Sequence, residues 1–268
     1  MPLRSTRWLL LLFALGGGLL PAVATSQTSE EAESGSHHSS PAKPSPGEAA
    51  ADLAPVAMRL TGLTNDFRQA EGHRALSPNP QLTAAARDFA DFMAQTRKYG
   101  HTADGNRPSA RAKQHGYDYC VVAENIAYQF STSGFTAEEL AQGLFQGWKQ
   151  SPGHRKNMLD PAVTDTGVAV AHSGQTGNYY AVQMFGRPAS ERVEFQLSNQ
   201  TSVAIQYSIG DRTFTLPPRS TRTHQQCRTA GLTVHWPGGQ EQPTVRPKNQ
   251  DRYAIVQEGG GQFRLQKE

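Results

Sequence analysis

Apolar residues recur at helical spacing in three stretches of the chain. The first stretch predicts an amphipathic helix that ends near Gly72, because glycine readily adopts the left-handed conformation that closes a helix. Its buried face carries residues three or four positions apart: Leu53, Val56, Leu60, Leu63 and Phe67. A second helix is expected after Pro80 and should end at Gly100, with an apolar stripe of its own: Leu82, Ala85, Ala86, Phe89 and Met93. A third helix begins at Thr136, which can form a capping box with Glu139. Its apolar face carries Leu140, Leu144 and Trp148.

Alternating apolar positions predict strands in the second half of the chain. Residues 166–171 and 179–185 flank a turn rich in Gly, Ser and Asn, which indicates an antiparallel hairpin. Helices followed by paired strands predict an α+β domain over residues 54–188. Six further short segments alternate in the same way: 193–197, 203–209, 213–216, 232–236, 253–257 and 262–265. They predict a small all-β sandwich or barrel over residues 189–268, in which we find no catalytic constellation.

The N-terminal region has the features of a secretory signal peptide. Arg4 and Arg7 precede an apolar run over residues 8–20, and Ala22-Val23-Ala24 forms a small-x-small cleavage pattern. An uncleaved anchor helix is the alternative, but this run is shorter than the roughly 20 residues that span a bilayer. We therefore expect a signal peptide over residues 1–24, a disordered Ser/Pro/Ala linker over residues 25–53 and no membrane anchor after cleavage. The protein should be secreted, and so extracellular or periplasmic.

The charge balance excludes some partners. The chain has 26 Lys and Arg residues against 23 Asp and Glu residues. Loss of Arg4 and Arg7 with the signal peptide leaves 24 basic residues, so the mature protein is nearly neutral. It carries no basic stripe that would favour nucleic acid. The composition leaves the oligomeric state open.

The two cysteines are Cys120 and Cys227. Export to an oxidising compartment permits a disulfide bond between them. They fall in the two separate predicted domains, however, so a bond would have to cross a domain boundary. Two separate thiols are the favoured expectation.

Three segments contain candidate chemistry. His101 should lie just beyond the C-terminal end of the second helix, and His154 follows a Pro-Gly turn at the start of a short predicted helix. Glu124 lies in an apolar stretch, where a carboxylate is costly to bury unless a cation or a hydrogen-bond donor meets it. A single histidine more often packs than binds a ligand. Two histidines and one carboxylate together are nevertheless the minimum set for a zinc site or an acid/base site.

The order of these segments resembles the CAP superfamily of cysteine-rich secretory proteins, antigen 5 and pathogenesis-related 1 proteins, also called SCP domains. The resemblance covers residues 60–186 and matches the form common in exported bacterial proteins. It rests on Asn65-Asp66-Phe67-Arg68, His101, Glu124-Asn125-Ile126, Trp148, Ser151-Pro152-Gly153-His154-Arg155, Gly167-Val168, Tyr180, Gln183 and Phe185-Gly186.

The resemblance implies a three-layer α-β-α sandwich with a cleft lined by a tetrad of two histidines and two glutamates. His101 and His154 match the two histidines, and Glu124 matches the first glutamate. Animal and plant members usually have the second glutamate where this chain has Ser151. Asn125, beside Glu124, is expected to shape the wall of this cleft.

The incomplete tetrad leaves several functions open. His101 and His154 can hold zinc or another divalent metal weakly, with Glu124 as a possible third ligand or as the candidate general base. We favour a binding module for a lipid, glycan or peptide, because Ser151 removes one negative charge from the site. The alternative is a metal-dependent hydrolase of peptides or envelope polymers that uses His101, Glu124 and His154. A secreted scaffold with a vestigial cleft is a third possibility.

A serine mechanism is disfavoured, because Ser151 and His154 are three residues apart across a Pro-Gly turn and no Gly-x-Ser-x-Gly motif occurs.

Overall fold

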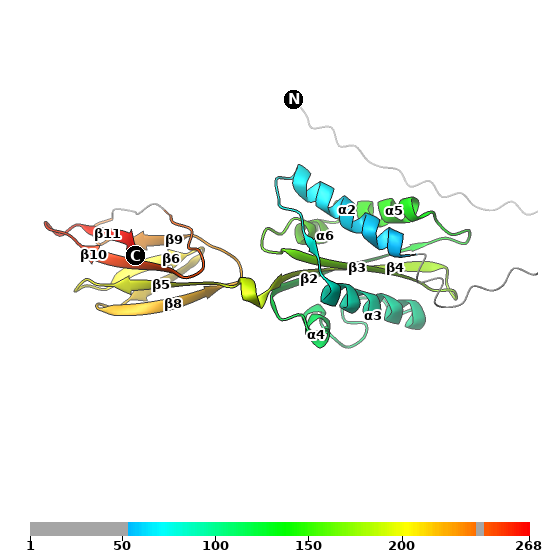
Figure 1. Cartoon of the computed structure of the whole chain (residues 1–268), viewed down its shortest axis with the longest axis horizontal. Helices are drawn as coiled ribbons and strands as arrows, with labels where there is room; N and C mark the ends of the chain where they lie inside the picture. The colour runs from blue at the N-terminus through cyan, green and yellow to red at the C-terminus, as the bar shows by residue number, and fades with distance from the viewer. Residues whose placement is uncertain (1–52, 240–243) are drawn as a thin grey trace, which may run out of the picture. The chain divides into compact units, whose positions relative to one another are not determined.

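The computed structural model describes residues 53–239 and 244–268 (Figure 1). The predicted signal peptide, and the predicted linker up to residue 52, lie outside these residues. Within the described part of the chain, every helix falls short of the length and apolar character needed to cross a membrane.

The N-terminal domain is a four-stranded sheet between two layers of helices, as predicted. Its strands are β1 (Ser77–Pro78), β2 (Tyr119–Phe130), β3 (Asp165–His172) and β4 (Asn178–Pro188). They lie in the order β1-β3-β4-β2; β1 is parallel to β3, and the other pairs are antiparallel. Its helices are α2 (Ala54–Ala70), α3 (Pro80–Thr96), α4 (Pro108–Gln114), α5 (Ala137–Gln150) and α6 (Pro152–Met158). Figure 1 shows α2, α5 and α6 on one face of the sheet and α3 and α4 on the other.

Each face of this sheet has a hydrophobic core. The predicted stripes of α2 and α5 pack together, and Trp148 is completely buried between them and the sheet. The stripe of α3 packs with Ile126, Val182 and Met184 from the opposite face. Successive strand residues alternate between the two faces, so the central strands supply side chains to both cores. This explains why β4 is apolar along most of its length.

Two helix ends confirm the sequence prediction and one corrects it. Helix α2 closes at Glu71 and Gly72, whose φ of 78° is in the left-handed region. Helix α5 has the complete capping box between Thr136 and Glu139. Helix α3, however, ends at Thr96 and not at Gly100, because Arg97 adopts the left-handed conformation with a φ of 61°. His101 therefore lies in a turn beyond the helix and not directly at its C-terminal end.

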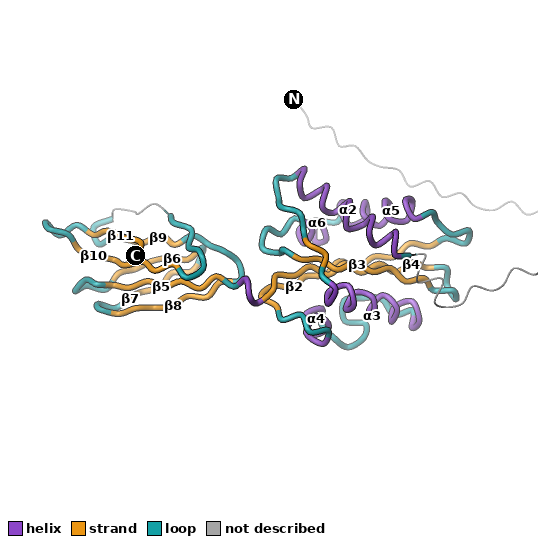
Figure 2. The backbone as a smooth tube through the Cα atoms, viewed as in Figure 1, coloured by secondary structure: helices purple, strands orange, loops and turns teal. Residues whose placement is uncertain are grey.

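The C-terminal region forms the predicted β-sandwich. Its strands are β5 (Val193–Asn199), β6 (Ile205–Ile209), β7 (Arg212–Leu216), β8 (Ser220–Gln226), β9 (Leu232–His235), β10 (Asp251–Gln257) and β11 (Phe263–Lys267). One sheet has the order β11-β10-β5-β8 and the other β7-β6-β9 (Figure 2). A short 3-10 helix, η1 (Ala189–Glu191), precedes β5. Side chains from both sheets, among them Phe195, Tyr207 and Val234, share one core.

Cys120 and Cys227 form a disulfide bond, with 5.1 Å between their Cα atoms. The favoured expectation of two separate thiols was therefore wrong. Strand pairing explains why the cysteines meet. The N–H of Ala189 donates to the carbonyl of Asp118 at 2.9 Å, which holds the start of β2 beside the connection to the sandwich. Val193 pairs with Gln226, which brings the end of β8 to the same connection.

Candidate functional site

A hollow of about 490 Å³ contains four of the five predicted site residues. The side chains of these four residues come from the turn after α3, from β2 and from the junction of α5 with α6. The lining residues are His101, Val122, Ala123, Glu124, Ser151, Gly153, His154, Lys156, Asn157, Asp160 and Arg228. Residues far apart in the sequence therefore meet at one edge of the sheet, since β2 is an edge strand.

His101 is held by Glu124. The Nδ1 atom of His101 lies 2.8 Å from the Oε1 atom of Glu124. The glutamate side chain is only 1% exposed, whereas that of His101 is about half exposed. Because Nδ1 is engaged, the Nε2 atom is the ring nitrogen left to meet a metal or ligand.

The second oxygen of Glu124 binds a buried arginine. The Nη2 group of Arg111 donates to the Oε2 atom of Glu124 at 2.6 Å and to the carbonyl of His101 at 3.0 Å. Its Nη1 group donates to Asp104 at 2.8 Å, and its guanidinium lies 3.6 Å from the centre of the Phe89 ring. The side chain of Arg111 is only 4% exposed. This ion pair supplies the cation that a carboxylate in such an apolar stretch requires.

Asn125 lies behind the hollow and not in its lining. It is completely buried, and its Nδ2 group donates to the carbonyl of His154 at 3.1 Å. Asn157 donates to the carbonyl of Glu124 at 3.1 Å and to the side chain of Asn125 at 2.9 Å. The two amides tie β2 to α6, and so fix the backbone that carries Glu124 relative to the backbone that carries His154.

Ser151 and His154 lie at the start of α6. Ser151 ends α5 and occupies the cap position of α6, but its side chain makes no capping hydrogen bond there. Burial lowers the pKa of His154 below its usual value, and the nearby charge of His101 lowers it further. A lowered pKa favours the neutral imidazole of His154, which is the form that binds a metal.

Two imidazoles, those of His101 and His154, line the hollow, whereas the carboxylate of Glu124 is already engaged. Both oxygens of Glu124 already have partners, one in His101 and one in Arg111. Asp160 is paired with Arg228, at 2.7 Å. Among residues 53–239 and 244–268, no group of three or more His, Cys, Asp or Glu side chains is arranged to hold a metal ion. A metal in this hollow would therefore have His101 and His154 as its only protein ligands among the described residues, with water in the remaining positions.

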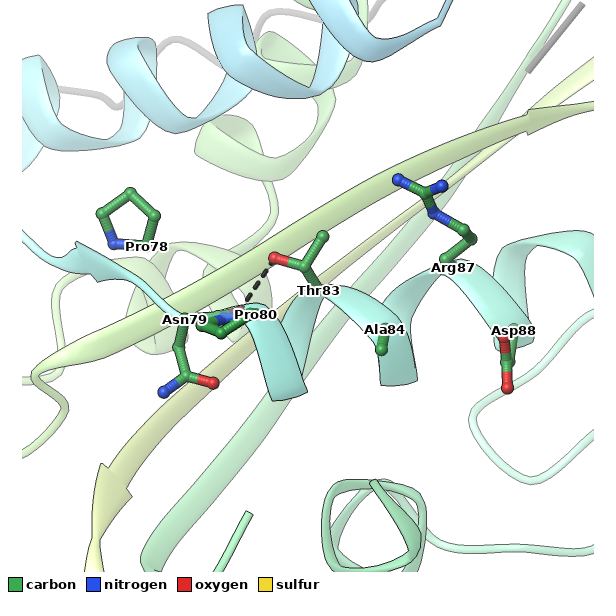
Figure 3. Close-up of a pocket in the computed structure, with 7 residues that line it drawn as sticks. All are labelled: Pro78, Asn79, Pro80, Thr83, Ala84, Arg87 and Asp88. Atoms are coloured by element: carbon green, nitrogen blue, oxygen red, sulfur yellow. Dashed lines mark hydrogen bonds between the residues drawn. The ribbon is translucent and has the colours of Figure 1, made fainter. Parts of the chain in front are cut away.

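A second hollow, at the start of α3, contains none of the predicted site residues. It has a volume of about 540 Å³ and is lined by Pro78, Asn79, Pro80, Thr83, Ala84, Arg87 and Asp88 (Figure 3). The hydroxyl of Thr83 donates to the carbonyl of Asn79 at 2.9 Å, as the dashed line in Figure 3 shows. Asp88 is paired with His115. The first contact stabilises the first turn of α3 and the second joins α3 to the end of α4, so we assign this hollow no chemistry.

The chain is similar to several known proteins. Residues 61–185 match the sequence model of the family described as "Cysteine-rich secretory protein family", or CAP. An uncharacterized protein of Bacillus subtilis (strain 168), YkwD, is 29% identical over 117 residues, which are 43% of this chain and 42% of that protein. The match thus spans less than half the length of either protein.

Two solved structures are also similar. One is an extracellular protein containing an SCP domain from Bacillus anthracis, with 23% identity, a TM-score of 0.47 and coverage of 54% of this chain and 44% of that chain. The other is an outer surface protein from Borrelia burgdorferi, with 17% identity, a TM-score of 0.45 and coverage of 51% of this chain and 96% of that chain.

Proposed function

We propose that this chain, whose residues 61–185 form a bacterial domain of the CAP superfamily, is an exported binding protein that takes its ligand in the cleft between His101 and His154. A divalent metal such as zinc, held weakly by the two imidazoles, would take part in binding. The ligand class is a lipid, a glycan or a peptide of the extracytoplasmic space.

The proposal rests on the contacts of Glu124, because both of its carboxylate oxygens already have partners. A general base must accept a proton from water, so it needs an accessible oxygen. The carboxylate of Glu124 is almost completely buried and shares its oxygens between His101 and Arg111. The same contacts suit a positioning residue, because they fix the orientation of the His101 ring. The arrangement therefore favours binding over the hydrolase alternative.

A bound metal would supply a positive centre for a ligand oxygen. The residues of the chain supply the rest of the cleft. His101 and His154 would hold the ion through ring nitrogens. Ser151 contributes a hydroxyl to the lining in place of a second carboxylate, so the cleft carries less negative charge. Lys156 adds positive charge to the wall, whereas the charge of Arg228 is balanced by Asp160, and the charge of Lys156 lowers the affinity for a dication further.

Zinc titration of the mature protein at pH 7.5 tests this proposal. We expect one zinc ion per chain to bind, and a His101→Ala/His154→Ala variant to lose this binding. A His73→Ala/His115→Ala variant is the matched control, because neither histidine lines the cleft, and it should bind zinc as the wild type does. Equal zinc binding by the wild type and the His101→Ala/His154→Ala variant would refute the metal site.

A further inference from the structure

We infer that the ligand of this cleft is an uncharged glycan, which also stacks on an aromatic platform formed by Tyr99, Tyr128 and Phe130. The inference rests on the proposed function, because it names the ligand class of the same cleft. It rests on the exposure of the three rings, the rigid support of the two tyrosines, the position of the rings beside the cleft, and the uncharged sequence around Tyr128 and Phe130.

The three rings are exposed to an unusual degree. The exposed fractions are 47% for Tyr99, 51% for Tyr128 and 58% for Phe130. Within the described chain they make up three of the five large hydrophobic residues that are exposed. Large aromatic side chains usually gain stability by burial, so a group of exposed rings indicates a binding surface.

The two tyrosines are held in place by their neighbours. Their ring centres are 5.1 Å apart, with the planes at 80° to each other. Both rings also contact the buried Tyr180, at 6.5 Å from Tyr99 and 5.8 Å from Tyr128. The hydroxyl of Tyr99 donates to the carbonyl of Ile126 at 3.2 Å. Little side-chain freedom would therefore be lost when a ligand stacks on these rings.

The platform begins beside the cleft. Tyr99 is two residues from His101, and its hydroxyl is hydrogen-bonded to the backbone of Ile126, which is two residues from Glu124 on β2. Glu124, Tyr128 and Phe130 are even numbers of residues apart on β2, so they share one side of the strand. At about 3.4 Å per residue, Tyr128 lies roughly 14 Å and Phe130 roughly 20 Å along the strand from Glu124. An elongated ligand is needed to reach both the histidines and the far ring.

The β2–β4 part of the platform has no charged neighbours in sequence. Residues 125–137 and 166–186 contain no Asp, Glu, Lys or Arg. They contain amides and hydroxyls instead, including Gln129, Ser131 and Asn178. At the other border, Arg97 and Lys98 precede Tyr99 and are exposed. An acidic ligand would need cations along the whole platform, which these segments do not supply.

Sugars match this chemistry better than lipids or peptides. The flat C–H face of a sugar ring packs on an aromatic ring, while its hydroxyls exchange hydrogen bonds with amides and hydroxyls. An acyl chain would instead gain most from an enclosed apolar groove. A linear oligosaccharide also has the length to connect the far ring to the cleft.

Binding assays on the full chain test the platform. The probes are hexa-N-acetylglucosamine and cellohexaose, compared with the uncharged hexapeptide (Ser-Gln)₃ and with phosphatidylcholine vesicles. We expect the wild type to bind at least one of the two glycans, and a Tyr128→Ala/Phe130→Ala variant to bind it at least about tenfold more weakly. Met58→Ala is the matched control, because Met58 is exposed on α2 outside the platform, and it should bind within about twofold of the wild type. Urea unfolding of each variant checks that the fold is retained.

Some outcomes would overturn the inference. It fails if neither glycan binds, if the Tyr128→Ala/Phe130→Ala variant binds them as well as Met58→Ala does, or if this variant loses peptide or vesicle binding instead. Zinc titration of the same proteins separates the two proposals. Zinc binding without glycan binding refutes the platform alone, whereas platform-dependent glycan binding without histidine-dependent zinc binding supports the platform and refutes the metal site.

Discussion

Arg111 holds the cleft together by joining Glu124, Asp104 and the backbone of His101. Breaking a buried ion pair by removing one partner leaves an uncompensated charge, which costs about 3–5 kcal/mol. We therefore expect Arg111→Met to lower the free energy of unfolding by this amount. Urea unfolding monitored by tryptophan fluorescence measures it.

The exposed pair of Arg59 with Glu138 provides a matched control for this substitution. Their contact, at 2.8 Å, is as short as that of Arg111 with Asp104, but both side chains are exposed to water. Arg59→Met should therefore lower the free energy of unfolding far less than Arg111→Met does, because water screens an exposed ion pair. The role of Arg111 as a structural ion-pair partner would be contradicted by an equal cost for the two variants.

For single residues, the sequence predicts which side chains line the cleft but not which side chains hold them in place. His101, Glu124, Ser151 and His154 were found from the order of short segments, and they line one hollow. The apolar surroundings of Glu124 indicated that a cation or donor must meet it. Nothing local distinguished Arg111 from the other basic residues, because its contact with Glu124 is created by the packing of α4 against β2.

Among the elements of the sandwich, β8 and β6 are linked across the two sheets by a histidine. The Nε2 atom of His224 on β8 lies 2.8 Å from the hydroxyl of Tyr207 on β6, and the His224 ring stacks on Phe195. Burial lowers the pKa of His224, and the charges of Arg222 and Arg212 lower it further. The unfolded chain, with a histidine pKa of about 6.5, then binds the proton more readily than the folded chain.

This pKa difference predicts how stability depends on pH. His224 makes its full contribution to the free energy of unfolding above about pH 6.5. This contribution is lost as the pH falls from there through the lower pKa of the folded state. Thermal unfolding at pH 7.5 and pH 5.5 should show a smaller decrease in Tm for His224→Gln than for the wild type. An equal decrease in both proteins would show that His224 does not contribute, and that other histidines account for the loss.

Elements with a strong periodic pattern were predictable, and elements without one were not. The stripes of α2, α3 and α5 and the hairpin of β3 and β4 were all confirmed. Strand β8 was missed because its sequence, Ser-Thr-Arg-Thr-His-Gln-Gln, has no apolar alternation. It forms because its backbone pairs with β5 along seven residues. The end of α3 was misplaced because Arg97, and not a glycine, closes the helix.

For the whole molecule, the disulfide bond joins the two predicted domains across 107 residues of sequence. A cross-link that closes so long a loop removes much of the conformational freedom of the unfolded chain, which corresponds to roughly 4–5 kcal/mol of stability. Cys120→Ser/Cys227→Ser should therefore unfold at a clearly lower urea concentration than the wild type under non-reducing conditions, which keep the wild-type bond intact. The same midpoint for both proteins would contradict a stabilising role of the bond.

The position of this bond also makes the N-terminal domain depend on the presence of the sandwich. Cys227 is followed directly by Arg228, which lines the cleft and pairs with Asp160, while Cys120 lies four residues before Glu124 on β2. A descendant that lost the sandwich would keep Cys120 as an unpaired thiol and would lose one wall residue of its cleft. Exchange of the sandwich for another domain would therefore require a compensating substitution at Cys120, so the two domains are expected to be inherited together.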